Sequence, residues 1–329
     1  WCDMTVRDET IRFGDGVAPI TIQVRETHLG PIINDNDLGE DGLPAGFNNT
    51  DPLALRWTGN TASTLLESAL LLNTASNWDE FRAALRFWNV PSQNFVYADV
   101  EGNIGYQNPG DSPIRAADHS GLEPVDGSTD AYEWKGFIPF DSLPRIYNPE
   151  RGYIATANQA VTPLAYYDQL AAELGDDANY LLSYDWSYGY RAQRINQMLT
   201  ELAPLNADDF AAIQGDDLDI NALEIMPALA ALTLDDAALA DARDWLGAWD
   251  GQAHMDSPQA ALWAWFTAPL LDNTFTDQLP ETSTPSSHNL FAVVQLLNDP
   301  ENVWWDDAAT PDIVETRDDI LTASLADAL

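Results

Sequence analysis

The sequence of 329 residues contains very little cysteine and very little lysine. Its single cysteine, Cys2, has no partner in the chain, which excludes an internal disulfide and a zinc site made of clustered cysteines. The only lysine is Lys135, and 14 basic residues face 53 acidic ones, for a net charge of −39. The negative electrostatic potential of such a chain repels nucleic acids and anionic lipids, so neither is expected as a partner.

Several motifs of common enzymes are also absent. The four histidines show no HExxH spacing, and there is no GxSxG, P-loop or GxGxxG motif, so these signatures of zinc proteases, α/β-hydrolases and nucleotide-binding folds are excluded. No apolar run is long enough to cross a bilayer, and no signal segment is present in the 329 residues. Because the sequence starts at Trp1 and stops at Leu329 within a helical pattern, we expect an interior fragment of a longer protein.

The acidic excess favours a folded protein adapted to high salt. Disordered acidic chains have few aromatic residues, whereas this chain has 12 tryptophans and 45% hydrophobic residues. At molar salt the Debye length falls to about 3 Å, so dense surface carboxylates repel one another only weakly. We therefore expect a halophilic protein with an acidic surface that loses its fold at low salt.

Apolar periodicity predicts an α+β fold. Alternating and β-branched residues predict strands at 10–13, 20–24, 93–99, 103–107 and 153–157, of which the third and fourth form a hairpin. Helical spacing predicts two helices, over 62–73 and 78–87, with Asn77 as the N-cap of the second. Helices predominate from Arg191 onward and begin near Asp208, Ala222, Asp235 and Ser257. Strands followed by helices indicate α+β, divided into a sheet-rich part at 1–190 and a mainly helical part at 191–329.

An ordered series of segments resembles the β-chain of the penicillin acylase family. Each segment is weak evidence alone, but their order and spacing together are specific and extend over nearly the whole chain. The segments are Arg7–Ile11, Thr27–Ile33, Leu55–Thr58, Asn77–Phe81, Pro91–Asn94, Tyr97–Asp99, Gly102–Tyr106, Tyr132–Gly136, Asn148–Asn158, Tyr190–Ile195 and Trp249–Gly251.

The resemblance implies an N-terminal-nucleophile hydrolase with a layered αββα core, only part of which is expected here. It also implies hydrolysis of a linear amide, in a substrate such as a penicillin, an N-acyl homoserine lactone or a lipopeptide. In this family a precursor (a zymogen) cleaves itself to expose an N-terminal serine, whose own α-amine is the base. An α-amine has a pKa near 7.7–8.0, so it can accept the hydroxyl proton at neutral pH.

Two residues match catalytic positions of the family. Asn158, which follows the predicted strand 153–157, matches the asparagine of the oxyanion hole, and its neutral amide can donate to the tetrahedral intermediate. Arg191 matches an arginine close to the active site, where its fork of donors can hold Asn158 or the leaving group. The structural alternatives are a turn or cap role for Asn158 and a surface ion pair for Arg191.

Other positions depart from the family pattern. The sequence after Cys2 matches a region well downstream of the family's nucleophile, so we interpret Cys2 as an ordinary residue and expect the serine upstream of Trp1. Leu29 stands where the family has histidine, with His28 one place earlier, and Gln159 replaces a second asparagine. The family often binds a structural Ca²⁺, but neither Asp176 nor Asp177 can be assigned as a ligand.

The resemblance also sets expectations for partners and location. The fragment alone should be inactive, an α-chain from the same precursor should be its partner, and the protein should be secreted. No cofactor is required for the chemistry. The alternative function is that of a catalytically inactive homologue that binds acyl ligands, which an altered residue at the upstream cleavage site would indicate.

Overall fold

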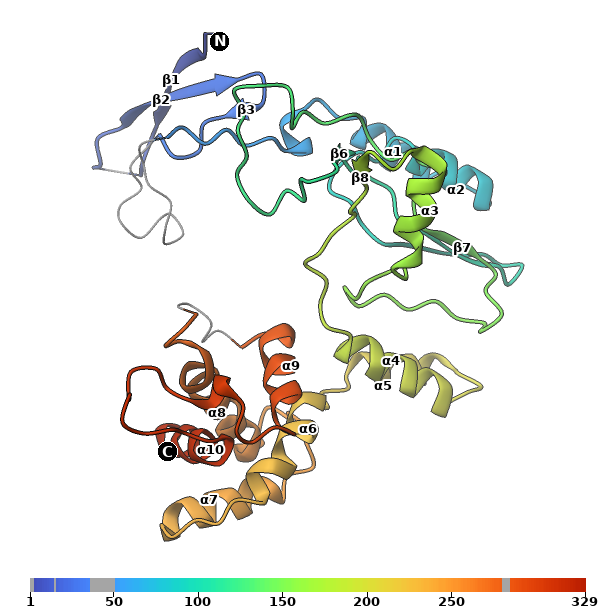
Figure 1. Cartoon of the computed structure of the whole chain (residues 1–329). Coiled ribbons are helices and arrows are strands. Elements are labelled where there is room, and N and C mark those ends of the chain that lie inside the picture. The colour runs from blue at the N-terminus through green and yellow to red at the C-terminus, as the bar shows by residue number, and fades with distance from the viewer. Residues whose placement is uncertain (1–2, 15, 36–50, 280–284) are drawn as a thin grey trace. The chain divides into compact units, whose positions relative to one another are not determined.

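A computed structural model describes residues 3–14, 16–35, 51–279 and 285–329 (Figure 1). The chain forms two compact units, and each is described by itself. The first comprises Trp1–Ile154 and Val161–Tyr184, and the second comprises Ala155–Ala160 and Asp185–Leu329. Cys2 lies outside the described residues.

The strands are short and antiparallel, and the described ones belong to the first unit. They form sheets of order β1-β2-β3, β4-β5-β7 and β6-β8. Their bounds are β1 Thr5–Ile11, β2 Ile20–Thr27, β3 Gly30–Pro31, β4 Phe95–Ala98, β5 Ile104–Gln107, β6 Arg115–Ala116, β7 Arg145–Tyr147 and β8 Ala178–Asn179.

Helices occur in both units and dominate the second. In the first unit they are the 3₁₀ turn η1 Thr58–Asn60, α1 Leu65–Leu72, α2 Trp78–Leu85 and α3 Ala165–Leu174. In the second they are α4 Tyr190–Glu201, α5 Ala207–Gln214, α6 Ile220–Ala230, α7 Ala237–Gly247, α8 Pro258–Phe275, α9 Ser287–Leu296, the 3₁₀ turn η2 Val303–Trp305 and α10 Arg317–Asp327. Small sheets combined with many helices confirm the predicted α+β class.

The predicted hairpin is β4–β5, and an aspartate shapes its turn. The Oδ1 atom of Asp99 accepts the backbone N–H groups of Glu101 and Asn103 at 3.0 and 2.9 Å, which stabilises the turn locally. The ring of Trp78, from α2, lies against Gly105 of β5 so closely that a Cβ there would come within 2.4 Å of it. Gly105 is therefore required for α2 to pack on this sheet.

Asn77 caps α2, as the sequence predicts. Its side chain accepts the backbone N–H of Glu80 at 2.9 Å. Replacement of Asn77 with alanine in the complete protein is therefore expected to lower the free energy of unfolding by about 1 kcal/mol. Urea denaturation at constant high salt measures this loss. The variant Asn77→Asp keeps the acceptor and should show little loss, and equal stability of the alanine variant would contradict the capping role.

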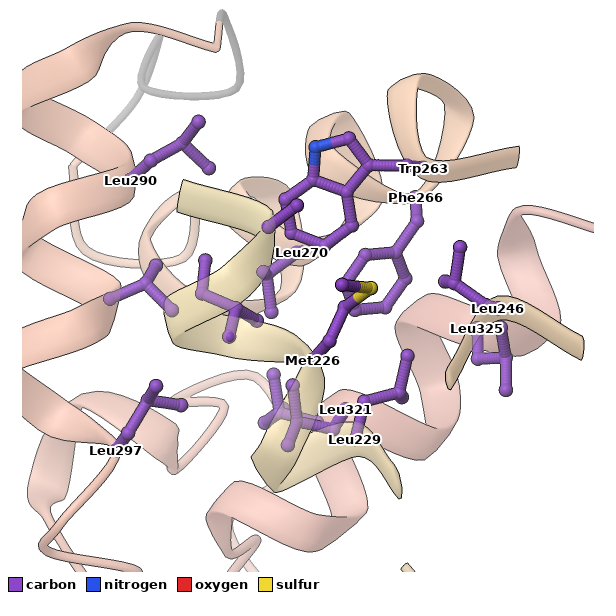
Figure 2. Close-up of a cluster of buried hydrophobic side chains, with 14 of the residues drawn as sticks. Met226, Leu229, Leu246, Trp263, Phe266, Leu270, Leu290, Leu297, Leu321 and Leu325 are labelled. Carbon is purple, nitrogen blue, oxygen red and sulfur yellow. The ribbon is translucent and has the colours of Figure 1, made fainter. Parts of the chain in front are cut away.

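The second unit has one large apolar core. It is built mainly from α6, α7, α8, α9 and α10, and Figure 2 shows Phe266 and Leu270 of α8 among leucines from the other helices. Phe266, Leu270, Leu246, Leu321 and Trp305 have no exposed surface at all. Ser257 caps α8 by accepting the N–H of Ala260, and Pro258 occupies its first turn, as predicted. This core supplies a rigid base for the residues that precede it.

In the first half, one predicted strand is wrong and one helix was not identified from the sequence. Residues 153–157 form no strand, because no described segment pairs with them, and alternation of side chains cannot replace a hydrogen-bonding partner. The region 1–190 also contains a third helix, α3. Its N-cap position is Leu164, whose side chain offers no cap, so the usual start signal is missing from the sequence.

The division of the chain into a sheet-rich part at 1–190 and a mainly helical part at 191–329 stays a prediction. Among the residues that the structure describes, no helix is long and apolar enough to cross a membrane.

Candidate functional site

Asn158 lies in a tight turn with an unusual backbone conformation. Its φ of 63° is in the left-handed region, which asparagine tolerates better than most residues. The turn is held by neighbours on both sides: the backbone N–H of Ser187 donates to Asn158 O at 2.8 Å, and that of Ala157 donates to Gln159 Oε1 at 2.7 Å. Because these contacts fix the backbone, the direction of the Asn158 side chain is fixed as well.

Arg191, in the first turn of α4, holds the Asn158 side chain. Its Nη2 donates to Asn158 Oδ1 at 2.7 Å and to the carbonyl oxygen of buried Ala157 at 3.0 Å. A guanidinium can only donate, so the amide atom that faces it must be the oxygen. The Nδ2 group then points away from Arg191, and within the described chain it makes no hydrogen bond. The arrangement presents a positioned N–H donor whose acidity the neighbouring cation increases.

Arg191 does not behave as an ordinary surface arginine. The described residues place no carboxylate within ion-pair distance of it, although the chain has 53 acidic residues. A cation in the first turn of a helix also opposes the helix dipole. One turn later, Arg194 shows the ordinary pattern, with two bonds to Asp216 at 2.7 and 2.8 Å. The position of Arg191 is thus unfavourable for stability alone and suits a role at a site.

The start of α4 is anchored by the residue next to Arg191. Buried Tyr190 donates its hydroxyl to Glu224 Oε2 of α6 at 2.6 Å, and burial together with this carboxylate raises the pKa of Tyr190. Tyr188 stacks on Phe291 of α9 with a centroid distance of 3.5 Å. These contacts tie α4 to the apolar core, so Arg191 projects from a fixed helix end.

The structure brings the two sequence-predicted site residues together, from segments 33 positions apart. It also adds bracing residues that sequence reasoning did not identify: Gln159, Ser187 and Glu224. Gln159 stood out in the sequence only as a departure from the family pattern, whereas Ser187 acts through its backbone and carries no signal. The roles of Asn158 and Arg191 in catalysis stay predictions.

One of the two residues considered for calcium, Asp177, pairs with the only lysine of the chain. Lys135 Nζ donates to the Asp177 carboxylate at 3.0 Å and to the Asp177 carbonyl oxygen at 2.6 Å, so an ammonium group already occupies the oxygen atoms that a metal would use. In the described ranges, no three acidic, histidine or cysteine residues are arranged to hold a metal ion.

Three of the family-like segments contact one another in the first unit. His28 Nε2 lies 2.7 Å from Glu133 Oε1, and Arg56 Nη1 lies 3.0 Å from Glu133 Oε2. The Arg56 guanidinium also lies over the ring of Trp134, 4.9 Å from its centroid. Segments that match the family thus pack together in space, which is expected if the whole set is inherited as one fold.

Comparison with known proteins gives a consistent result. The penicillin amidase family model matches residues 1–329. Penicillin G acylase of Escherichia coli is 31% identical over 71% of this chain and 25% of its own length. The acyl-homoserine lactone acylase QuiP of Pseudomonas fluorescens is 30% identical over 100% of this chain and 41% of its own length. The chain thus spans well under half of these curated relatives.

A solved structure agrees with the fold. Thermostable penicillin G acylase from Alcaligenes faecalis superposes with a TM-score of 0.67 at 24% identity, over 99% of this chain and 60% of that one. At this identity the likeness shows the fold, which is that of an N-terminal-nucleophile hydrolase. Together with the family match over all 329 residues, it establishes that the chain belongs to the penicillin amidase family.

Proposed function

We propose that this chain supplies the oxyanion-binding part of an enzyme that hydrolyses a linear amide of an N-acyl compound. The observation that carries the proposal is the hydrogen bond of 2.7 Å between Arg191 Nη2 and Asn158 Oδ1, which leaves the amide N–H₂ of Asn158 available as a donor. Family membership supports the reaction class, since its named relatives are acylases.

The chain's own residues have distinct tasks in this mechanism. When a nucleophile attacks the amide carbonyl, negative charge develops on the carbonyl oxygen, and Asn158 Nδ2 donates to it. Arg191 orients this donor and adds positive charge behind it, and no proton has to move in either residue. Gln159 and Ser187 keep the turn from relaxing as the charge forms.

The remaining catalytic groups belong to the finer proposal. The nucleophile is a serine at the N-terminus of the processed β-chain, outside the 329 residues, and its α-amine accepts the hydroxyl proton. The 329 residues alone are then inactive. The partner is an α-chain from the same precursor, and a relative from Pseudomonas sp. is indeed named a penicillin acylase 2 proenzyme. The family resemblance also supports export of the protein.

The N-terminal residue of the processed chain tests this proposal. The complete protein is expressed in high salt, and mass spectrometry identifies the first residue of the subunit that contains residues 1–329. We expect serine, together with release of the amine from an N-acyl homoserine lactone or a penicillin. An uncut precursor, or a cut that exposes a residue other than serine, threonine or cysteine, would favour an inactive homologue that binds acyl ligands.

A further inference from the structure

The basic residues are few, and nearly all of them are neutralised. Ten of the 14 form an ion pair within 4.0 Å: Arg7, Arg25, Arg56, Arg82, Arg86, Lys135, Arg145, Arg194, Arg243 and Arg317. Within the described residues the other four, Arg12, Arg115, Arg151 and Arg191, have no such partner. Arg12 is exposed, Arg151 bonds the carbonyl of Tyr153, and Arg191 bonds Asn158. Only Arg115 is partly buried without an acceptor.

Arg115 is held in place by backbone on two sides. It belongs to β6 and pairs with Asn179 of β8. The chain at Gly121 covers its guanidinium: a Cβ at that glycine would lie 3.0 Å from Nε and 3.3 Å from both Cζ and Nη2. Gly121 therefore packs over the Nε–Nη2 side of the guanidinium. Arg115 makes no side-chain hydrogen bond within the described residues, and its nitrogen atoms are not among the fully buried ones, so N–H donors of the group are open to a ligand.

No carboxylate of the described residues lies within ion-pair distance of Arg115. Burial lowers the pKa of Arg115, and the hydroxyl of Tyr184 opposes this change. Nearby, burial and the Arg115 charge lower the pKa of His119, while the exposed carboxylate of Asp118 opposes them. In a chain of net charge −39, a partly buried cation without a carboxylate partner among the described residues is an exception that costs stability.

We propose that Arg115 is the centre of a carboxylate-binding site, in which one carboxylate lies against the open edge of the guanidinium, beside Tyr184 and His119. The carboxylate comes either from another part of the complete protein or from a small organic acid. Once bound, it neutralises the cation and accepts two parallel hydrogen bonds from it.

The shape and charge of the site favour a carboxylate over other anions. The guanidinium edge matches the two coplanar oxygens of a carboxylate. The surrounding negative field also penalises a dianion more than a monoanion, because the repulsion scales with ligand charge. A singly charged, planar group is therefore the ligand that this site fits best.

The sign of a stability change tests the proposal in the complete, processed protein. The variant Arg115→Met keeps the length of the side chain and removes its charge. If a protein carboxylate pairs with Arg115, the variant leaves that carboxylate partly buried and alone, and the unfolding equilibrium constant should rise about tenfold or more. If Arg115 has no partner, the same change removes a desolvated charge and should leave stability equal or increased. Arg12→Met, at an exposed position, is the control and should change the constant less than about threefold.

Acetate distinguishes the two sources of the carboxylate. Unfolding is measured at constant high salt, with chloride alone and with part of the chloride replaced by sodium acetate. Destabilisation of Arg115→Met in chloride alone indicates a carboxylate of the protein. Stabilisation by acetate of the wild type, but not of Arg115→Met, indicates a small organic acid. If the variant is as stable as the wild type in both media, the proposal is overturned.

A second variant covers the case in which Arg115→Met does not fold. Arg115→Lys keeps the positive charge but not the planar fork. Folding of the lysine variant with stability near that of the wild type would support a requirement for charge, and hence the bound carboxylate. Failure of both variants to fold would show that the shape of the arginine under Gly121 is what matters, and it would overturn the proposal.

Discussion

Replacement of Asn158 with glycine in the complete enzyme is expected to lower kcat for an N-acyl amide substrate by about 10²–10³, with little change in KM. Loss of one preorganised donor to the oxyanion removes stabilisation that exists mainly in the transition state. Glycine is the appropriate replacement because Asn158 has a φ of 63°, where alanine would introduce strain of its own. Steady-state kinetics at constant high salt measures the effect.

A matched control separates this role from that of a turn residue. Asn148 is the other described non-glycine residue with a left-handed backbone, at φ 47°. Its Oδ1 accepts the N–H of Ile104 at 2.9 Å, and its Nδ2 donates to Asn103 Oδ1 at 2.8 Å, so both ends of its amide are used in structure. Asn148→Gly should lower the free energy of unfolding by about 1 kcal/mol and leave kcat unchanged.

Asn158→Asp adds a second comparison. Aspartate tolerates the same backbone conformation and can still accept from Arg191, but it lacks the N–H donor and carries a negative charge. Its kcat should fall at least as far as that of the glycine variant. A kcat near the wild-type value in either Asn158 variant would remove Asn158 from the oxyanion hole and return it to the role of a turn residue.

The sequence predicted the parts of the fold that depend on local signals. Asn77 and Ser257 mark helix starts because their side chains accept backbone N–H groups a few residues away, and such caps can be recognised in sequence. The elements that the sequence did not predict correctly depend on contacts distant in sequence. Residues 153–157 carry a strand-like pattern without a pairing partner, and α3 forms without a capping side chain. Both outcomes are decided by tertiary contacts, which local patterns do not contain.

The candidate site, too, was predicted only in part from the sequence. Asn158 and Arg191 were found through family resemblance, since no spacing rule relates two residues that far apart in sequence. Their direct contact at 2.7 Å, and the orientation of the Asn158 amide that follows from it, became visible only in the structure. The lack of an ion-pair partner for Arg115 among the described residues was also invisible in sequence, because it depends on where the carboxylates lie in space.

Transfer of the complete protein from molar salt to a buffer below about 0.1 M salt is expected to unfold it. At this dilution the Debye length exceeds about 10 Å, and two like charges 10 Å apart repel by about 0.4 kcal/mol in water. With a net charge of −39 in these residues alone, a few tens of such pairs are comparable with the usual 5–15 kcal/mol of total stability. Tryptophan fluorescence reports the loss, because Trp305 and Trp263 are buried in the second unit.

Neutralising exposed acidic residues should reduce this salt requirement. Glu123, Glu150, Asp241 and Asp312 are exposed and make no ion pair or hydrogen bond within the described ranges. A variant with glutamine or asparagine at all four should therefore unfold at a lower salt concentration than the wild type. The matched control neutralises Asp216 instead, whose pKa is lowered by its bonds to Arg194. Loss of that ion pair should raise the salt requirement, although the net charge also becomes less negative. If both variants shift the midpoint equally, or if the wild type stays folded without salt, charge repulsion does not limit the stability of this protein.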